Sequence, residues 1–186
     1  MKYFKKIEGE KVYLSPMNLE DIEKYVKWMN DFSTTDGLGS SSKVTTFESE
    51  RAWLINNMDK KEQQFAIVLK ETDKLIGNCG FVDINHLHQR GEVGLFIGEE
   101  ENRSKGYGTE ALSLLVEYGF NYLNLKNIML KVFSFNKRAI KSYEKIGFKV
   151  FGKRTEDYYL NGKWYDEYFM EILRKEKWLI NVNKNG

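Results

Sequence analysis

The sequence has little cysteine and almost no net charge, and each shortage argues against a class of protein. The one cysteine, Cys79, cannot form a disulfide within the chain, which favours a reducing compartment. The 29 basic and 27 acidic residues leave a net charge of +2, so there is no electrostatic case for a nucleic-acid surface. The N-terminal residues lack the apolar core of a signal peptide, and no apolar run is long enough to span a membrane. We therefore expect a cytoplasmic protein that binds neither nucleic acid nor membrane.

Histidine is also scarce, and this bears on metal and covalent chemistry. The only two histidines, His86 and His88, fall in one predicted turn without a third Cys, His or carboxylate at ligand spacing. Cys79 lies in a predicted strand with no sign of a nearby base or of a low thiol pKa, so we expect it to pack in the core. The sequence therefore predicts neither a metal site nor a covalent cysteine intermediate.

What is present fits one soluble domain. At 186 residues, with 41% hydrophobic and 30% charged residues, the chain is long enough to bury a core of its own. We found no internal repeat and no linker, and we expect a single domain over residues 1–186. From Glu176 onward we expect a short C-terminal extension with a frayed end.

The most informative stretch is a glycine-containing loop that opens a helix. Arg103, Gly106 and Gly108 precede a run whose apolar residues recur at helical spacing, namely Leu112, Leu115, Val116, Gly119 and Leu123. Glycines let main-chain N–H groups approach a ligand, and the helix N-terminus adds unpaired N–H groups and the positive end of its dipole. This arrangement favours an anion at the loop.

Other functions of the glycine loop are less well supported by the sequence or stay open. A dinucleotide fold would place Asp or Glu at the end of the next strand, but the predicted strand 128–135 is followed by Asn136. A triphosphate loop needs Lys and then Ser or Thr directly after its last glycine, and here Thr109 and Glu110 follow Gly108. The glycines alone are equally compatible with a helix start that binds nothing.

A family resemblance adds to this local argument. The order Arg103-x-x-Gly106-x-Gly108, then a strand, then Asn136, Ala139, Tyr143 and the run GluLysIleGlyPhe at 144–148 resembles the acetyl-CoA signature of the GCN5-related N-acetyltransferases (GNAT). The resemblance covers about residues 82–152 strongly. It implies an α/β (α+β) fold with a mixed, mostly antiparallel central sheet of about seven strands flanked by helices.

Two branches of that superfamily share further segments with the chain. Residues 158–167 resemble the ribosomal-protein N-terminal acetyltransferases, whereas 84–90, 117–120 and 123–125 resemble bacterial spermidine acetyltransferases. The acceptor therefore stays open between a protein N-terminus, a polyamine and another small amine. A polyamine would require converging carboxylates, for which the N-terminal candidates are Asp31, Asp36, Glu48 and Glu50.

The resemblance also implies which residues bind acetyl-CoA, the expected co-substrate. The loop would hold the pyrophosphate, the backbone of residues 95–97 the thioester and pantetheine, and Asn136 the pantetheine arm. The expected set is Leu95, Phe96, Ile97, Arg103, Ser104, Lys105, Gly106, Tyr107, Gly108, Thr109, Asn136 and Ala139. Read without the resemblance, Asn136 is a helix cap.

For the chemistry, the resemblance assigns Tyr143 as the acid that protonates the departing thiolate. Asn136 and Tyr143 are seven residues apart on a predicted helix, so both could line one channel. Glu92, at the start of a splayed strand, is the candidate base, directly or through water, with a solvated edge carboxylate as the equal alternative. The expected reaction is direct transfer in a ternary complex, without a metal.

Local patterns predict the remaining elements. We expect strands at 11–15, 65–69, 75–84, 91–98 and 128–135, a helix at 137–146 closed by Gly147, and a hairpin turning at Asn161-Gly162. Residues 32–46, rich in Ser, Thr and Gly, are expected to form a loop, either a substrate lid or a plain connection. Thr45 and Glu48 are spaced as a capping box, and Gly94 suggests a bulge or a close backbone approach.

Two other functions from different classes compete with the enzyme. One is a non-catalytic acetyl-CoA-binding sensor, against which the hydroxyl of Tyr143 argues because a pure binder does not need it. The other is a nucleic-acid module built on the aromatic hairpin at 158–168, which the charge balance disfavours. A homodimer is a further expectation, because exposed sheet edges in such folds often pair.

Overall fold

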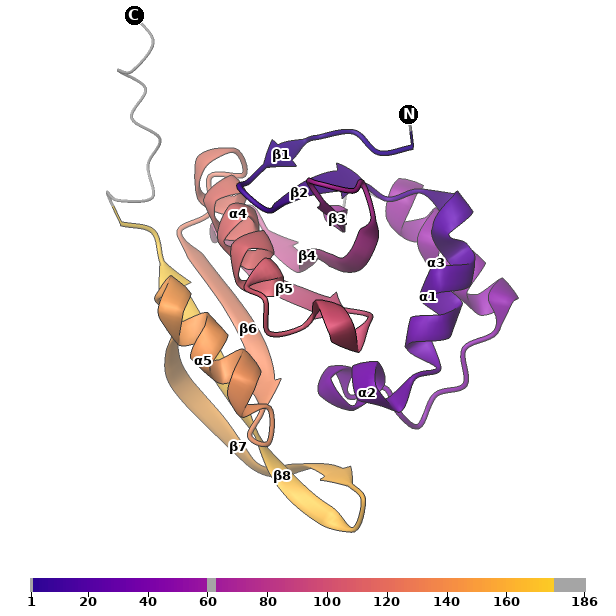
Figure 1. The fold of residues 1–186 in the computed structure, drawn as a ribbon. Coiled ribbons are helices and arrows are strands. Elements are labelled where there is room, and N and C mark those ends of the chain that lie inside the picture. The colour runs from indigo at the N-terminus through magenta and orange to yellow at the C-terminus, as the bar shows by residue number, and fades with distance from the viewer. Residues whose placement is uncertain (1, 60–62, 176–186) are drawn as a thin grey trace, which may run out of the picture.

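The computed structural model describes residues 2–59 and 63–175, and the expected extension from Glu176 lies outside them. An eight-stranded sheet runs through the molecule in the order β1-β2-β3-β4-β5-β6-β8-β7 (Figure 1). Neighbouring strands are antiparallel except for the parallel pair β5 and β6. The expected mixed, mostly antiparallel α/β fold is confirmed, with the two-residue β1 as the strand beyond the seven expected.

The elements have the following bounds. The strands are β1 (Ile7–Glu8), β2 (Val12–Pro16), β3 (Gln64–Leu69), β4 (Leu75–Asn85), β5 (Arg90–Ile97), β6 (Asn127–Phe133), β7 (Lys149–Leu160) and β8 (Lys163–Leu173). The helices are α1 (Ile22–Met29), α2 (Phe32–Thr35), α3 (Phe47–Asp59), α4 (Tyr107–Asn121) and α5 (Lys137–Ile146), with short 3-10 turns η1 (Leu19–Asp21), η2 (Asp36–Leu38) and η3 (Glu100–Asn102).

Two hydrophobic cores lie on opposite faces of the sheet. Strand side chains alternate between faces, so Val12 and Ile67 pack in the core beneath α4, whereas Tyr13 and Val68 pack in the core beneath α1 and α3. Helix α4 contributes Leu112, Leu115, Val116 and Phe120 to the first core, and α1 contributes Ile22, Tyr25 and Trp28 to the second. Helices thus cover the two faces over different strands (Figure 1).

The strands β5 and β6 separate soon after they meet. Their parallel pairing runs from Arg90 with Asn127 to Glu92 with Met129, although β5 continues to Ile97 and β6 to Phe133. The expected splay after Glu92 is confirmed. Of the two alternatives for Gly94, the bulge is wrong, because Gly94 pairs regularly with Gly80 and the register shifts at Val82 of β4 instead. A close backbone approach is not found either, because among the described residues a Cβ on Gly94 would meet only Val82 Cγ1, at 3.7 Å.

The segment 32–46 is more ordered than a loop. Asp31 caps α2 by accepting a hydrogen bond from Ser33 N, and η2 follows directly. Ser and Thr are favoured at helix starts as well as in loops, so composition did not separate the two. The capping box is also displaced by one residue: Thr46 Oγ1 accepts from Ser49 N, whereas Thr45 N donates to the side chain of Asn30.

The other local predictions hold. Helix α5 spans Lys137–Ile146 with Asn136 as its cap, and it ends at Gly147, whose φ of 116° only glycine adopts readily. Asn161 and Gly162 have φ of 49° and 81°, as a two-residue type I′ hairpin turn requires. The β7–β8 hairpin extends beyond the helices in Figure 1.

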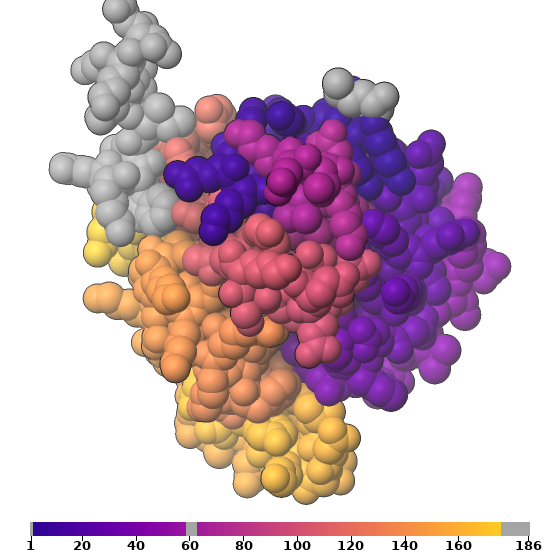
Figure 2. Space-filling model, in the orientation of Figure 1, coloured from indigo at the N-terminus to yellow at the C-terminus, as the bar shows by residue number. Residues whose placement is uncertain are grey.

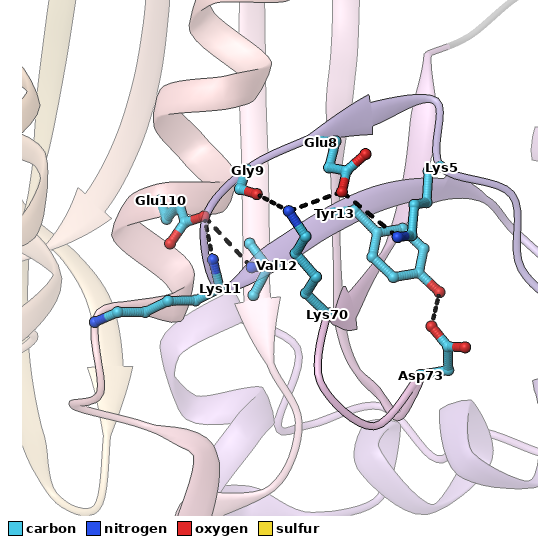
Figure 3. Close-up of polar contacts among 9 residues, drawn as sticks. All are labelled: Lys5, Glu8, Gly9, Lys11, Val12, Tyr13, Lys70, Asp73 and Glu110. Atoms are coloured by element: carbon cyan, nitrogen blue, oxygen red, sulfur yellow. Dashed lines mark hydrogen bonds and ion pairs between the residues drawn. The ribbon is translucent and has the colours of Figure 1, made fainter.

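The N-terminal strands are attached to the start of α4. Glu110 Oε1 accepts hydrogen bonds from Lys11 N at 2.9 Å and Val12 N at 3.4 Å (Figure 3). Lys70 Nζ holds the same turn by donating to Gly9 O at 3.1 Å and pairing with Glu8 at 2.7 Å. A side chain on Gly9 would collide with Glu110 Oε1, so this residue allows the close approach.

Within residues 2–59 and 63–175, none of the helices has the length and apolar character needed to cross a membrane.

Candidate active site

The glycine loop has the backbone geometry that an anion site needs. Ser104 and Gly106 have φ of 62° and 88°, and α4 begins directly after Gly106. The first N–H groups of a helix have no partner one turn earlier, and the helix dipole places positive potential at the same point. Gly106 is required here because a side chain at this φ would be strained.

The side chain of Arg103 supports the glycine loop through hydrogen bonds to other parts of the protein. Its guanidinium donates five hydrogen bonds: to Ile97 O (3.1 Å), Gly98 O (2.8 Å), Thr34 Oγ1 (2.8 Å), Ser33 O (3.0 Å) and Ser33 Oγ (3.2 Å). Burial lowers the pKa of Arg103 from its ordinary value. The side chain therefore joins the end of β5 to α2, which makes it a positioning group for the loop.

A recess, which we call the loop recess, lies between the glycine loop, α2 and α5. The segments that form it meet near the centre of the face shown in Figure 2. They are α5 in orange, residues 99–108 in red and the N-terminal helices in indigo and purple. The recess brings together eleven of the fourteen expected cofactor-binding and catalytic residues, from three separate stretches: Leu95, Phe96, Ile97, Arg103, Ser104, Gly106, Gly108, Thr109, Asn136, Ala139 and Tyr143.

Three predicted residues lie elsewhere. Lys105 and Tyr107 line a separate depression with Lys11 and Lys70, on the side of the loop near β1 and β2. Glu92 lies outside the loop recess, on the neighbouring recess described below. Side chains at successive positions of a loop point in different directions, which spacing alone does not resolve.

Sequence reasoning missed seven residues of the loop recess. Four come from residues 32–46, which were expected to form a loop, and three from α5 and the turn before the glycines: Ser33, Thr34, Gly37, Leu38, Asn102, Arg138 and Ser142. Arg138 and Ser142 could have been found, because they lie between Asn136 and Tyr143 on α5. Thr109 and Ser142 share a short hydrogen bond that ties α4 to α5.

Asn136 is the cap of α5, and its side chain also lines the loop recess. Its side-chain oxygen accepts a hydrogen bond from Ala139 N at 3.2 Å, which caps α5. Its amide nitrogen faces Gly37 across the loop recess, 3.4 Å from the position that a Cβ on Gly37 would take. The capping oxygen therefore leaves an N–H donor turned toward the recess.

Tyr143 lies where the loop recess meets a second one. This second recess, which we call the sheet recess, opens on the other side of the β5–β6 splay and is lined by Leu38, Val82, Glu92, Val93, Gly94, Leu95, Leu130, Lys131, Val132, Phe133, Tyr143 and Glu167. The two recesses share Leu38, Leu95 and Tyr143. Burial raises the pKa of Tyr143 to about 12, against a smaller lowering by Arg138, so its hydroxyl keeps its proton at neutral pH.

The sheet recess carries charge on the face away from α4 and α5. Glu92 Oε1 forms an ion pair with Lys131 Nζ at 3.0 Å, and both side chains are partly exposed. Among the described residues, no group of three or more His, Cys, Asp or Glu is arranged to hold a metal ion. The chemistry available at the junction is therefore that of a tyrosine hydroxyl, backbone dipoles and carboxylates.

Comparison with known proteins agrees with this geometry. The model of the acetyltransferase (GNAT) domain matches residues 11–149. The N-acetyltransferase p20 of Bacillus licheniformis is 30% identical over 170 residues, which cover 90% of this chain and 95% of that protein. The spermidine N(1)-acetyltransferase of Escherichia coli K12 is 36% identical over 107 residues, which cover 57% of this chain and 55% of that enzyme.

Solved structures show the same fold. The spermidine N-acetyltransferase of Vibrio cholerae, in complex with CoA and spermine, superposes with a TM-score of 0.80 at 24% identity, covering 89% of this chain and 96% of that one. A GNAT acetyltransferase of Bacillus anthracis superposes with a TM-score of 0.77 and covers 90% of this chain. Because the domain model spans most of the chain and p20 matches nearly end to end, this protein belongs to the GNAT family of acetyltransferases.

Proposed function

We propose that this protein transfers the acetyl group of acetyl-CoA to a primary amine, by direct transfer in a ternary complex. The observation that carries the proposal is the junction at Leu38, Leu95 and Tyr143, where the loop recess and the sheet recess meet through the β5–β6 splay. Two substrates that enter from opposite sides of the sheet would meet at these residues. The family membership gives the reaction class.

The loop recess fits acetyl-CoA as a substrate. The turn at Ser104 and Gly106, with the α4 N-terminus, suits a pyrophosphate, and Arg138 adds a positive side chain on the same wall. The edge of β5 from Leu95 to Ile97 is not paired with β6, so its backbone groups are available to the pantetheine arm. The Vibrio cholerae relative is described as a complex with CoA, which supports the same assignment here.

Tyr143 is the proposed acid. The amine nitrogen forms the new C–N bond to the thioester carbonyl, and the C–S bond breaks with its electrons moving to sulfur. The protonated phenol of Tyr143, at the junction, can give its proton to that sulfur. Donors that line the splay would stabilise the oxyanion of the tetrahedral intermediate.

The acceptor is a primary amine, with a protein N-terminus, a polyamine and another small amine all still to be tested. Of the four N-terminal carboxylates considered for a polyamine, Asp36 lines a surface recess with Phe32, Tyr158 and Tyr159. Glu50 is buried in α3, where burial raises its pKa, so it is not an open cation site. The spermidine acetyltransferases among the relatives support testing polyamines first.

The test is thiol release from acetyl-CoA with spermidine, spermine, peptides with N-terminal Ala or Ser, and aminoglycosides. We expect turnover with one of these classes and acetylated product by mass spectrometry. Acetyl-CoA binding by calorimetry without turnover on any amine would favour the non-catalytic sensor instead. A cytoplasmic location and a homodimer stay predictions, and size measurement in solution would check the dimer.

A further inference from the structure

The sheet recess contains a second carboxylate, Glu167, that the reading of the sequence passed over. Glu167 lies on β8 opposite Phe133 of β6, on the face that also carries Lys131. The residue is only 8% exposed, although its side chain lines the recess. A largely buried carboxylate at the wall of an open recess is stabilised by a partner of opposite charge.

Within the part of the protein that the structure describes, Glu167 has only a long contact with a group of opposite charge. The nearest cation is Arg154 Nη1 at 3.9 Å, on a side chain that is 63% exposed. Among the described residues no hydrogen bond to the Glu167 carboxylate is found, whereas Glu92 in the same recess has Lys131 at 3.0 Å. The more solvated carboxylate thus has a close ion pair, whereas the more buried one has only a long contact with an exposed side chain.

The charged groups around Glu167 come from the two neighbouring strands, β6 and β7, and from β5. Burial raises its pKa most, and Asp157 on β7 and Glu92 on β5 raise it further, while Lys131 on β6 and Arg154 on β7 oppose them. A carboxylate with a raised pKa is a stronger base than an ordinary glutamate, and it gains most from an incoming ammonium group.

We infer that Glu167 binds the ammonium of the acceptor amine in the sheet recess and removes its proton, the role that the sequence had suggested for Glu92. This inference rests on the proposed function. The recess reaches Tyr143 and Leu95, so an amine held by Glu167 lies on the acceptor side of the junction. Glu92, paired with Lys131, then shapes the recess without acting as the base.

The proton transfers balance. The ammonium gives one proton to the Glu167 carboxylate, and the free amine attacks the thioester carbonyl. When the C–S bond breaks, Tyr143 gives its proton to the thiolate, and the second proton of the nitrogen replaces it on the phenol. Glu167 then releases its proton to solvent, so the sum is amide, free thiol and one proton.

The test compares Glu167→Gln with Glu171→Gln and Glu92→Gln in the full chain. Glu171 lies on the same face of β8 outside the recess, and it accepts a hydrogen bond from Asn127 Nδ2 at 2.7 Å that glutamine can also accept. We expect Glu167→Gln to lower kcat/KM by about 10²-fold or more with unchanged acetyl-CoA affinity by calorimetry. The control should stay near wild type, and Glu92→Gln should lose less than Glu167→Gln.

The pH profile separates a base from a merely structural residue. Wild-type kcat/KM should rise with pH through an inflection above the ordinary glutamate range, and that limb should disappear in Glu167→Gln. Wild-type turnover with an unchanged rate and pH profile in Glu167→Gln would overturn the inference and leave the proposed function standing. Absence of wild-type turnover on every amine would overturn both.

Discussion

At the scale of single residues, the two loop glycines have different tasks. Gly106 has a φ of 88°, where a side chain costs roughly 1–2 kcal/mol, whereas Gly108 lies in the first turn of α4. A Cβ on Gly108 would meet Ile97 Cγ1 at 3.5 Å and Leu95 Cδ1 at 3.6 Å, which is ordinary contact. A side chain would therefore strain the backbone at Gly106 but not at Gly108, where the absence of a side chain keeps the wall of the loop recess open.

We predict that Gly106→Ala lowers Tm, by about 2–4 °C for each kcal/mol of strain in a chain of this size, and weakens acetyl-CoA binding. Gly108→Ala is the matched control for stability, because alanine favours a helix and its Cβ has room. Thermal unfolding and calorimetry on both variants measure the two effects. An equal Tm for Gly106→Ala and wild type would contradict the requirement for glycine.

Local rules explain which residues the sequence predicts well. Asn136 and Gly147 at the ends of α5, and Asn161-Gly162 in the hairpin, follow from capping and turn chemistry that involves only near neighbours. The partners of Arg103 and the burial of Glu167 depend on segments far apart in the chain, so no local pattern shows them. The bulge at Val82 rather than Gly94 likewise depends on strand register.

At the scale of elements, α2 and the end of β5 form one unit through Arg103. Thr34 Oγ1 donates to Gly98 O at 3.0 Å and accepts from Arg103, so the buried Thr34 closes a network between the two segments. The wall formed by Ser33, Thr34 and Leu38 therefore depends on a side chain of the glycine loop. This network thus connects one wall of the loop recess to the glycine loop.

We predict that Arg103→Ala destabilises the fold by about 1.5–3 kcal/mol, the usual contribution of hydrogen bonds to a charged group, and increases amide hydrogen exchange in α2. Arg103→Lys should recover little, because an ammonium cannot reproduce a forked set of five bonds. Arg51→Ala on the exposed side of α3 is the control. Unchanged exchange at residues 33–35 would show that Arg103 does not hold the unit together.

At the scale of the whole molecule, the sheet separates two recesses, and they meet at the splay, where the proposed mechanism brings the two substrates together. One face presents the loop recess beneath α4 and α5, the other presents the sheet recess, and Tyr143 belongs to both. A family resemblance implied the mixed, mostly antiparallel sheet, but the parallel pair that creates the splay and the order of strands were not predicted, because they follow from contacts that composition and periodicity do not encode. The proposed acetyl transfer therefore depends on residues that only the folded sheet brings together.

The measurement that tests this account most directly is turnover by Tyr143→Phe, with acetyl-CoA and the best amine of the panel. We predict a fall in kcat of about 10²-fold or more with acetyl-CoA affinity unchanged, because only the proton donor at the junction is lost. Tyr122→Phe, at the exposed end of α4, should behave as wild type. Equal kcat in Tyr143→Phe and wild type would contradict the assignment of acid catalysis to the place where the two recesses meet.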